Sequence, residues 1–128
     1  MIAGLGVDLV ELERFLWSWR RWGDRLPKRL LADAERKAMP PGMGPRSVAY
    51  LAGRFAAKEA VLKALGTGLA RGIGWHDIRI AGSPAGEPRV VLSKSAAKLA
   101  AERRIRTVHL SISHTASTAA AVAVAEAD

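Results

Sequence analysis

The stretch GRFAAKEAVLKALGTG, from Gly53 to Gly68, decides the fold of this chain. It predicts a long helix that begins near Arg46 and ends at Gly66, because alanine, leucine and phenylalanine are acceptable helix residues and glycine often follows the last helical turn. Apolar residues lie on every side of this helix, which is typical of a helix that crosses the middle of a fold. We therefore expect it to be the central element of the structure.

Glu59 is the exception within this apolar helix. At about 100° per residue, it falls in the middle of an apolar stripe. The stripe is formed by Val48, Ala52, Phe55 and Leu62. An isolated buried charge is very costly, so this carboxylate must be paired, bound to a metal or protonated. Lys63 lies one helical turn further on, and a simple Glu59–Lys63 ion pair would be sufficient to explain both residues.

Composition narrows the class of protein. The chain has 128 residues, of which 49% are hydrophobic, so we expect a single domain over residues 1–128 with a real core. No apolar run approaches the roughly 20 residues that span a bilayer, and the N-terminus MIAGLGVDLV lacks the basic flank of a signal peptide. With no cysteine, disulfide and thiol chemistry are excluded, and a cytoplasmic location is expected. The net charge of +8 favours an anionic partner. The alternative explanation is that these charges only keep the protein soluble.

The N-terminal segment from Ile2 to Leu9 alternates as a strand does. One face carries the larger side chains and the other is nearly bare: Ala3, Leu5, Val7 and Leu9 against Ile2, Gly4, Gly6 and Asp8. Glycine in a strand often marks the close approach of another group. Asp8 closes the run, and on its own it is most simply a solvated strand end or a helix cap.

Helices are predicted over three further segments. Residues Val10 to Trp22 have an apolar stripe, and Leu26 to Met39 indicate a second, shorter helix with Leu30, Leu31 and Ala34 inward. Ser93 to Arg104 is amphipathic, with Ser93 as a plausible N-cap. Three tryptophans, Trp17, Trp19 and Trp22, exceed what one narrow stripe can bury. A surface that meets a partner and a role in the core and in subunit contacts explain them about equally well.

The remaining strands form two predicted hairpins. Trp75 to Ile80 pairs with Arg89 to Leu92 across a turn, and Thr107 to Thr115 pairs with Ala119 to Ala125, with His114 on the inward face of its strand. The unbroken small apolar residues of the last strand are typical of a strand covered on both faces. The element order predicts an α+β fold in which an antiparallel sheet packs on the long central helix.

Three polar groups interrupt apolar faces: Asp8, Glu59 and His114. Two carboxylates suit Mg²⁺, which is commonly held by one or two carboxylates together with substrate phosphate oxygens. The glycine-rich GTG after the central helix would offer backbone N–H groups to an anion. Periodicity alone leaves this metal site and the plain Glu59–Lys63 pair about equally favoured, and a lone His114 would usually be structural.

Three segments together resemble the holo-(acyl-carrier-protein) synthase group of 4′-phosphopantetheinyl transferases. They are GLGVDLVEL near the N-terminus, GRFAAKEAVLKALGTG in the middle, and SISHT followed by an alanine–valine strand. The match runs from end to end, in order and with the usual spacing. The central motif is long and specific, SISHT is moderately specific, and the N-terminal GxGxD alone is weak.

The resemblance implies a magnesium-dependent enzyme that transfers 4′-phosphopantetheine from coenzyme A to a serine of an apo acyl carrier protein and releases 3′,5′-ADP, a step of fatty acid biosynthesis and lipid metabolism. Asp8 and Glu59 match the magnesium ligands of the family, and Glu59 is also a candidate base. Lys63 matches the lysine beside the coenzyme A phosphates and is a candidate catalytic residue that protonates or stabilises the leaving group. Arg54 and His114 match positions near the 3′-phosphate, and Gly66 and Thr67 would line the same cleft.

The resemblance also implies partners. Arg14 and Arg21 match the basic first helix that receives the acidic carrier protein. The family is typically a homotrimer whose active sites are shared between subunits, which would give the extra tryptophans and the bare Gly4/Gly6 face a packing partner. The tryptophan-rich segment Trp17 to Trp22 and the loop from Met39 to Arg46 depart from the usual pattern.

Two other functions compete with this interpretation. A small basic nucleic-acid-binding module would explain the charge, but no helix-turn-helix, zinc or RNA-binding signature is visible and Glu59 would stay unexplained. A degenerate family member that binds the carrier without catalysis is disfavoured because Asp8, Glu59 and Lys63 are all present. We therefore expect a transferase with no nucleic-acid or membrane partner.

Overall fold

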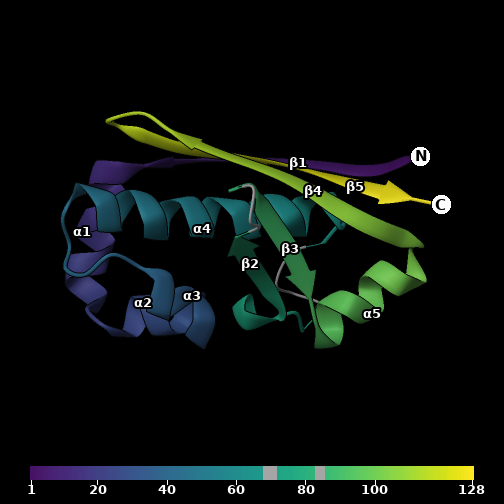
Figure 1. The fold of residues 1–128 in the computed structure, drawn as a ribbon, viewed down its shortest axis with the longest axis horizontal. Coiled ribbons are helices and arrows are strands. Elements are labelled where there is room, and N and C mark those ends of the chain that lie inside the picture. The colour runs from purple at the N-terminus through teal and green to yellow at the C-terminus, as the bar shows by residue number, and fades with distance from the viewer. Residues whose placement is uncertain (68–71, 83–85) are drawn as a thin grey trace.

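The computed structural model describes residues 1–67, 72–82 and 86–128, and its three-stranded sheet lies along the long helix α4 (Figure 1). The elements follow one another in the order β1 (Ile2–Glu11), α1 (Leu12–Trp22), α2 (Arg25–Leu30), α3 (Asp33–Ala38), α4 (Pro45–Ala64), the 3₁₀ turn η2 (Trp75–Asp77), β2 (Ile78–Gly82), β3 (Pro88–Leu92), α5 (Lys94–Glu102), β4 (Ile105–His114) and β5 (Thr118–Ala127). The predicted α+β class is confirmed.

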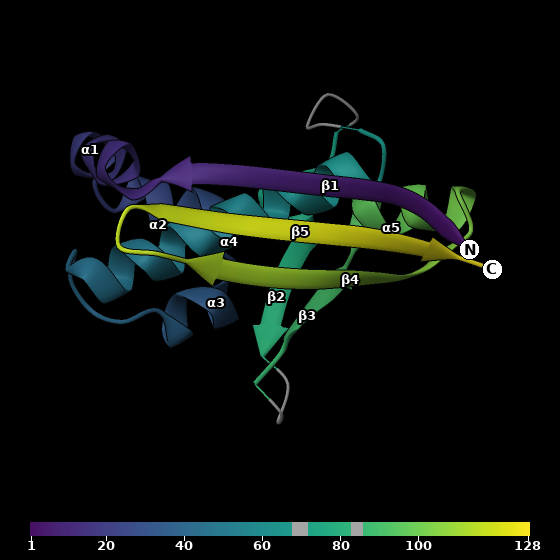
Figure 2. The ribbon, with the colours of Figure 1, turned by 90° about the horizontal axis from the view of Figure 1, so that it is seen from above.

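The sheet that covers α4 has the strand order β1-β5-β4, with both pairs antiparallel. Figure 2 shows β5 in the middle, with β1 and β4 on its two sides and α4 behind the sheet. A separate antiparallel pair, β2 and β3, lies on the other side of α4. The long helix is therefore sandwiched between the sheet and the remaining elements, as its apolar residues on all sides predict.

Strand β1 lies very close to α4 because its inward face carries glycine. A Cβ atom added to Gly4 would stand 1.9 Å from the carbonyl oxygen of Ala64, and one added to Gly6 would stand 1.9 Å from that of Ala60. No real Cβ tolerates such a contact. The bare face of β1 thus packs within its own chain, and the expectation that it awaits a neighbouring subunit is wrong. This close approach also holds Asp8, the next inward residue, against α4.

The core is built from small side chains on the facing surfaces of sheet and helix. Alternate residues of β5 are buried against α4, namely Ala119, Ala121, Ala123 and Ala125. Val122 points the other way and is 45% exposed, so β5 is covered on one face only in the single chain. The prediction that both faces of this strand are covered is wrong for the single chain. Small apolar residues alone did not distinguish the buried face of β5 from its exposed face.

Three local predictions differ from the structure. The single helix expected over Leu26 to Met39 is two helices, α2 and α3, broken at Leu31 and Ala32. This break turns Glu35 inward in place of Ala34, which is exposed. The strand expected from Trp75 begins only at Ile78, after the 3₁₀ turn. Ser93 occupies the N-cap position of α5, but within the described residues its side chain makes no capping hydrogen bond.

Within residues 1–67, 72–82 and 86–128, no helix combines the length and apolar character needed to cross a membrane. Parts of two predicted loops, residues 68–71 of the glycine-rich segment after α4 and residues 83–85 of the β2–β3 turn, lie outside the described residues.

Candidate active site

Asp8 and Lys63 meet where β1 crosses the C-terminal half of α4. The ammonium Nζ of Lys63 donates one hydrogen bond to the backbone oxygen of Val7, at 2.8 Å, and another to Oδ1 of Asp8, at 3.2 Å. The Asp8 side chain is 18% exposed and that of Lys63 is 51% exposed, so the pair stands at the surface. Lysine therefore pairs with the strand carboxylate, whereas the simple Glu59–Lys63 pair is not the ion pair that forms.

Glu59 completes this cluster from the same helix. It is half-buried, which corrects the expectation of a fully buried carboxylate. Burial raises the pKa of Glu59, the negative charge of nearby Asp8 raises it further, and the positive charge of Lys63 opposes both effects. Two carboxylates thus share one lysine, so the cluster has a net negative charge when all three groups are ionised. We call Asp8, Glu59 and Lys63 the carboxylate cluster.

The carboxylate cluster has a set of oxygen donors that could hold a hard divalent cation. Among the described residues, no group of three or more His, Cys, Asp or Glu side chains forms a ready metal cage. Mg²⁺ does not require one, because it usually keeps waters and is held by one or two carboxylates plus substrate phosphates. The mutual repulsion of Asp8 and Glu59 is the kind of uncompensated charge that such an ion would relieve.

Arg54 and His114 lie together elsewhere, in a groove of about 510 Å³. We call it the Arg54 groove; its lining is Pro40, Pro45, Arg46, Ala49, Tyr50, Gly53, Arg54, Gly82, Gly86, Pro88, Ile112 and His114. The Arg54 guanidinium carbon stands 4.2 Å from the centre of the Tyr50 ring. Its Nε is buried and has no hydrogen-bond partner in the part of the chain that the structure describes. An arginine that lines a groove is suited to an anionic ligand, because its fork of donors matches two oxygen acceptors.

The Arg54 groove and the carboxylate cluster do not meet within one chain. Asp8 pairs with Ala121 on one side of β5, and His114 pairs with Ala119 on the other. Since neighbouring strands are about 4.8 Å apart, the two outer strands stand roughly 10 Å apart across β5. Helix α4 lies beneath, with Glu59 directed toward β1 and Arg54 directed toward β4. Within one chain, the residues of the predicted coenzyme site thus lie in two places, one beside β1 and one beside β4.

Gly66 and Thr67 close the C-terminus of α4. Gly66 has φ +83°, its N–H donates to Lys63 O at 3.0 Å, and the N–H of Thr67 donates to Leu62 O at 3.0 Å. This pair of bonds is the Schellman arrangement that ends many helices. The expectation that the GTG offers these two N–H groups to an anion is wrong, because both already satisfy the helix end; Gly68 lies outside the described residues.

Arg14 and Arg21 are exposed on α1, as predicted. Arg14 borders a shallow hollow at the junction of β1 and α1, a short distance along the chain from Asp8. Trp17 is 70% exposed and Trp22 is 48% exposed, whereas Trp19 is buried in the core. The excess tryptophan surface is therefore real and lies on the same helix as the two arginines.

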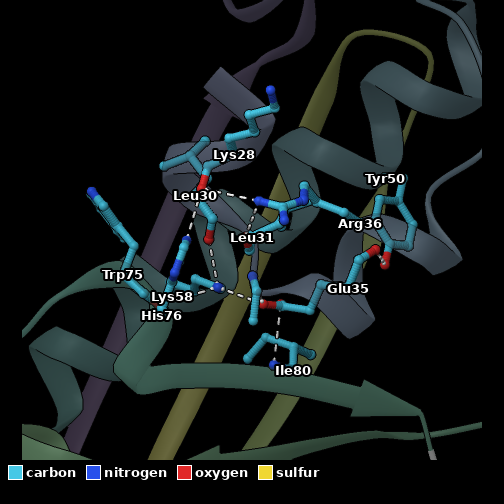
Figure 3. A network of polar contacts seen from close by, with 11 residues as sticks. Lys28, Leu30, Leu31, Glu35, Arg36, Tyr50, Lys58, Trp75, His76 and Ile80 are labelled. Atoms are coloured by element: carbon cyan, nitrogen blue, oxygen red, sulfur yellow. Dashed lines mark hydrogen bonds and ion pairs between the residues drawn. The ribbon is translucent and has the colours of Figure 1, made fainter. Parts of the chain in front are cut away.

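A second charged network, which sequence reasoning missed, joins α4 to α2, α3 and β2 (Figure 3). The Nζ of Lys58 is fully buried and donates to Leu30 O at 2.6 Å, to Oε1 of Glu35 at 2.8 Å and to Trp75 O at 3.2 Å. These bonds use all three donors of an ammonium group. Burial lowers the pKa of Lys58, and the hydrogen bond and charge of Glu35 oppose that shift. Lys58 directly precedes Glu59 in an apolar helix, and this position was a signal that it is buried too.

Arg46 is another residue absent from the predicted site, although it lines the Arg54 groove. It follows Pro45, the first residue of α4, so the start of this helix presents its guanidinium to the groove. The signal was a basic residue at the beginning of the central helix, on the same element as Arg54.

Comparison with known proteins identifies the family of this chain. The model of the 4′-phosphopantetheinyl transferase superfamily matches residues 4–124. The holo-[acyl-carrier-protein] synthase of Nitratidesulfovibrio vulgaris is 47% identical over 127 residues, covering 98% of this chain and 99% of that protein. The solved synthase of Neisseria meningitidis has a TM-score of 0.89 at 36% identity, covering 98% of this chain and 99% of the other. The synthase of Bacillus anthracis, solved in complex with CoA (3′,5′-ADP), has a TM-score of 0.79 at 35% identity, covering 100% and 99%. The chain belongs to the 4′-phosphopantetheinyl transferase superfamily, as an enzyme of its holo-[acyl-carrier-protein] synthase group.

Proposed function

We propose that this enzyme transfers 4′-phosphopantetheine from coenzyme A to a serine hydroxyl of an apo acyl carrier protein, releases 3′,5′-ADP, and depends on Mg²⁺ held by Asp8 and Glu59. The carboxylate cluster carries the proposal: Asp8 lies near enough to Glu59 to raise its pKa, and Lys63 stands beside both. The Bacillus anthracis relative, named as a complex with CoA (3′,5′-ADP), supports the same class of ligand.

The chemistry assigns a role to each member of the cluster. The serine oxygen forms a bond to the phosphorus that bears phosphopantetheine, the P–O bond to 3′,5′-ADP breaks, and the serine proton must leave. Glu59 accepts this proton directly or through a water, for which a raised pKa is suitable. Lys63 already donates to Val7 O and Asp8, and its third N–H is suited to the charge that builds on the leaving phosphate. When bound, Mg²⁺ would neutralise part of the negative charge of the pyrophosphate.

The Arg54 groove is the proposed site for the 3′-phosphate end of coenzyme A. Arg54 and Arg46 supply guanidinium groups, and His114 supplies an imidazole, around one hollow. Arginine is well suited to phosphate because its fork of donors matches two phosphate oxygens.

A homotrimer with shared active sites is proposed because, within one chain, the residues of the site lie in two places, one beside β1 and one beside β4. One subunit would supply the carboxylate cluster and its neighbour the Arg54 groove. The outer face of the sheet supports an assembly: Leu5, Val7, Leu9 and Val122 are 45–70% exposed, and Val7 pairs directly with Val122. An exposed apolar patch of this kind is typical of an interaction surface.

The acidic carrier protein is proposed to dock on α1 through Arg14 and Arg21. Arg14 borders the hollow next to the end of β1, so a carrier held there would have its serine near Asp8. The net charge of +8 favours association with an acidic partner.

Transfer is tested by incubating the enzyme with apo carrier proteins from fatty-acid, polyketide and peptide synthesis, together with coenzyme A and Mg²⁺, and weighing the carrier. We expect the mass of a phosphopantetheine group to appear on the preferred carrier and to disappear when Mg²⁺ is chelated. Absence of the mass gain on every carrier would refute the proposed function, and full transfer in the presence of chelator would refute the metal.

Sharing of the site is tested by mixing two inactive variants, Glu59→Gln and Arg54→Ala, after dissociation and reassembly. If each site takes its halves from two subunits, random mixing restores about one quarter of the sites. If each chain holds a whole site, the mixture stays as inactive as its components.

A further inference from the structure

Glu35 links helix α4 to strand β2, two elements that each contribute other residues to the lining of the Arg54 groove. Its Oε1 accepts hydrogen bonds from Lys58 Nζ on α4, at 2.8 Å, and from the Ala32 N–H, at 3.0 Å. Its Oε2 accepts from the N–H of Ile80 on β2, at 3.2 Å. Helix α4 supplies Tyr50 and Arg54 to the groove, and β2 supplies Gly82, two residues beyond Ile80. One buried carboxylate therefore sets the spacing between α4 and β2.

The backbone of Glu35 reaches the groove by a second route. Its carbonyl oxygen accepts a hydrogen bond from the Tyr50 hydroxyl at 2.7 Å, and Figure 3 shows Tyr50 directed toward Glu35. The Tyr50 ring in turn supports the guanidinium of Arg54, whose carbon stands 4.2 Å from the ring centre. The direction in which Arg54 presents its donors thus depends on where α3 holds Tyr50.

Stability alone does not explain a buried ion pair at this place. Removing two charges from water offsets much of the attraction between them, and well-packed apolar residues often stabilise a core equally well. A buried polar network in which every donor is used does, however, fix one geometry. Lys58 uses its three donors, and the two Glu35 oxygens accept three bonds between them, so this network leaves α3, α4 and β2 little freedom.

We propose that Glu35 and Lys58 are positioning residues for coenzyme recognition: they fix the spacing of α4 and β2 and, through Tyr50, aim Arg54 at the 3′-phosphate of coenzyme A. This inference rests on the proposed function of the Arg54 groove. Neither residue lines the Arg54 groove. Their effect is exerted through Arg54, so it depends on the presence of the 3′-phosphate.

The test uses the double variant Glu35→Gln/Lys58→Met in the full-length enzyme, which removes both charges and leaves no unpaired ion. We expect KM for coenzyme A to rise by at least about tenfold, while kcat at saturating coenzyme A falls less than KM rises. With 3′-dephospho-coenzyme A, which lacks the phosphate that Arg54 would bind, wild type and variant should have nearly equal KM values. A rise in KM with both substrates, or with neither, would overturn the inference.

Arg36→Ala is the matched control, because Arg36 also lies on α3. Its guanidinium contacts Asp33 and the carbonyl oxygens of Lys28 and Leu31, none of which lines the groove. We expect a lower Tm with unchanged KM. An Arg36→Ala enzyme with the same substrate-dependent KM change as the double variant would show that general loosening of α3 is the cause, and would overturn the inference.

Tyr50→Leu provides an independent test that buries no charge. It removes both the hydroxyl that holds Glu35 and the ring that supports Arg54. The same selective rise in KM for coenzyme A is expected, and an unchanged KM would overturn the inference even if the double variant does not fold. Wild-type transfer, measured in the same assay, separates these results from failure of the proposed function.

Discussion

Helix α4 carries two lysine–carboxylate clusters that differ in whether their charges are satisfied. Lys58 and Glu35 are both buried, and their donors and acceptors are taken up by backbone groups and by one another. Lys63 and Asp8 stand at the surface, and Glu59 adds a second carboxylate that raises the local negative charge. We call the Lys58–Glu35 pair the closed cluster, because it has no capacity left for a ligand. The carboxylate cluster of Asp8, Glu59 and Lys63 does have such capacity, and we call it the open cluster. Similar residue types on one helix therefore serve structure on one side and, we propose, chemistry on the other.

The largest expected difference is in stability. Lys58→Met leaves Glu35 as an unpaired buried charge, and breaking a buried pair in this way costs about 3–5 kcal/mol. Lys63→Met breaks a pair of which the lysine is half exposed, and exposed pairs contribute about 0–1 kcal/mol. Urea unfolding of the two variants measures both effects. Equal losses would contradict the division into a closed and an open cluster.

Glu59→Gln should lower the transfer activity without lowering the stability. It removes a charge from the open cluster, so we expect transfer activity to fall by roughly 100- to 1,000-fold. Stability of the metal-free enzyme should not fall, because the substitution relieves repulsion from Asp8. Rates at saturating coenzyme A and carrier, measured beside the unfolding curve, test both statements. An unchanged rate would remove Glu59 from the mechanism.

Gly6→Ala tests whether the open cluster depends on the close packing of β1. Its Cβ would meet the Ala60 carbonyl oxygen at 1.9 Å, so the strand must move away from α4 and carry Asp8 with it. We expect a loss of about 1–3 kcal/mol together with a lower rate. Gly44→Ala is the control: φ is −76° there, and no heavy atom of the described residues lies within 4 Å of the added Cβ. Similar losses in the two variants would contradict the account of β1.

The smallest effect is a pH dependence of stability. Because the folded-state pKa of Glu59 is raised, protonation stabilises the native state below the unfolded-state pKa, and this contribution is lost as pH rises through the folded-state pKa. Glutamine resembles the protonated acid. The metal-free Glu59→Gln variant should therefore be more stable than wild type at neutral pH, with the gap closing in acid. A difference in the free energy of unfolding between Glu59→Gln and wild type that widens as the pH falls would contradict the raised pKa of Glu59.

The apparent Mg²⁺ affinity of the wild type should change over the same pH range. Glu59 must lose its proton to bind the metal, and its pKa is raised in the metal-free enzyme, so the apparent affinity should fall with acid at a pH above the ordinary glutamate value of about 4.3. An affinity that stays constant down to that value would contradict the role of burial and of Asp8 in setting this pKa.

The sequence predicts the open cluster better than the closed one, for physical reasons. Asp8, Glu59 and Lys63 interrupt apolar patterns, and the glycines of β1 mark a close approach that the structure confirms at Ala60 and Ala64. Glu35 was missed because a regular helix over Leu26 to Met39 directs Ala34 inward, whereas the break at Leu31 and Ala32 rotates α3. A break of this kind depends on tertiary contacts, here the bonds from Lys58 and Ile80 to Glu35, which periodicity does not encode.

The division of the site could not be derived from the motifs. Arg54 and Glu59 are five residues apart on one helix, so a motif joins them, but the helix directs them toward β4 and β1 respectively. Likewise the GTG motif suggests an anion-binding loop, while the positive φ of Gly66 commits its N–H and that of Thr67 to closing α4. A single sequence motif can therefore contain residues that face different sites.

Calorimetric titration of Mg²⁺, with 3′,5′-ADP saturating for each variant, tests the central claim most directly. The wild type and the Glu35→Gln/Lys58→Met variant should both bind Mg²⁺, because the closed cluster is not a ligand site, whereas Glu59→Gln should bind at least about tenfold more weakly. Equal Mg²⁺ affinity in the wild type and in Glu59→Gln would contradict the assignment of the open cluster as the metal site.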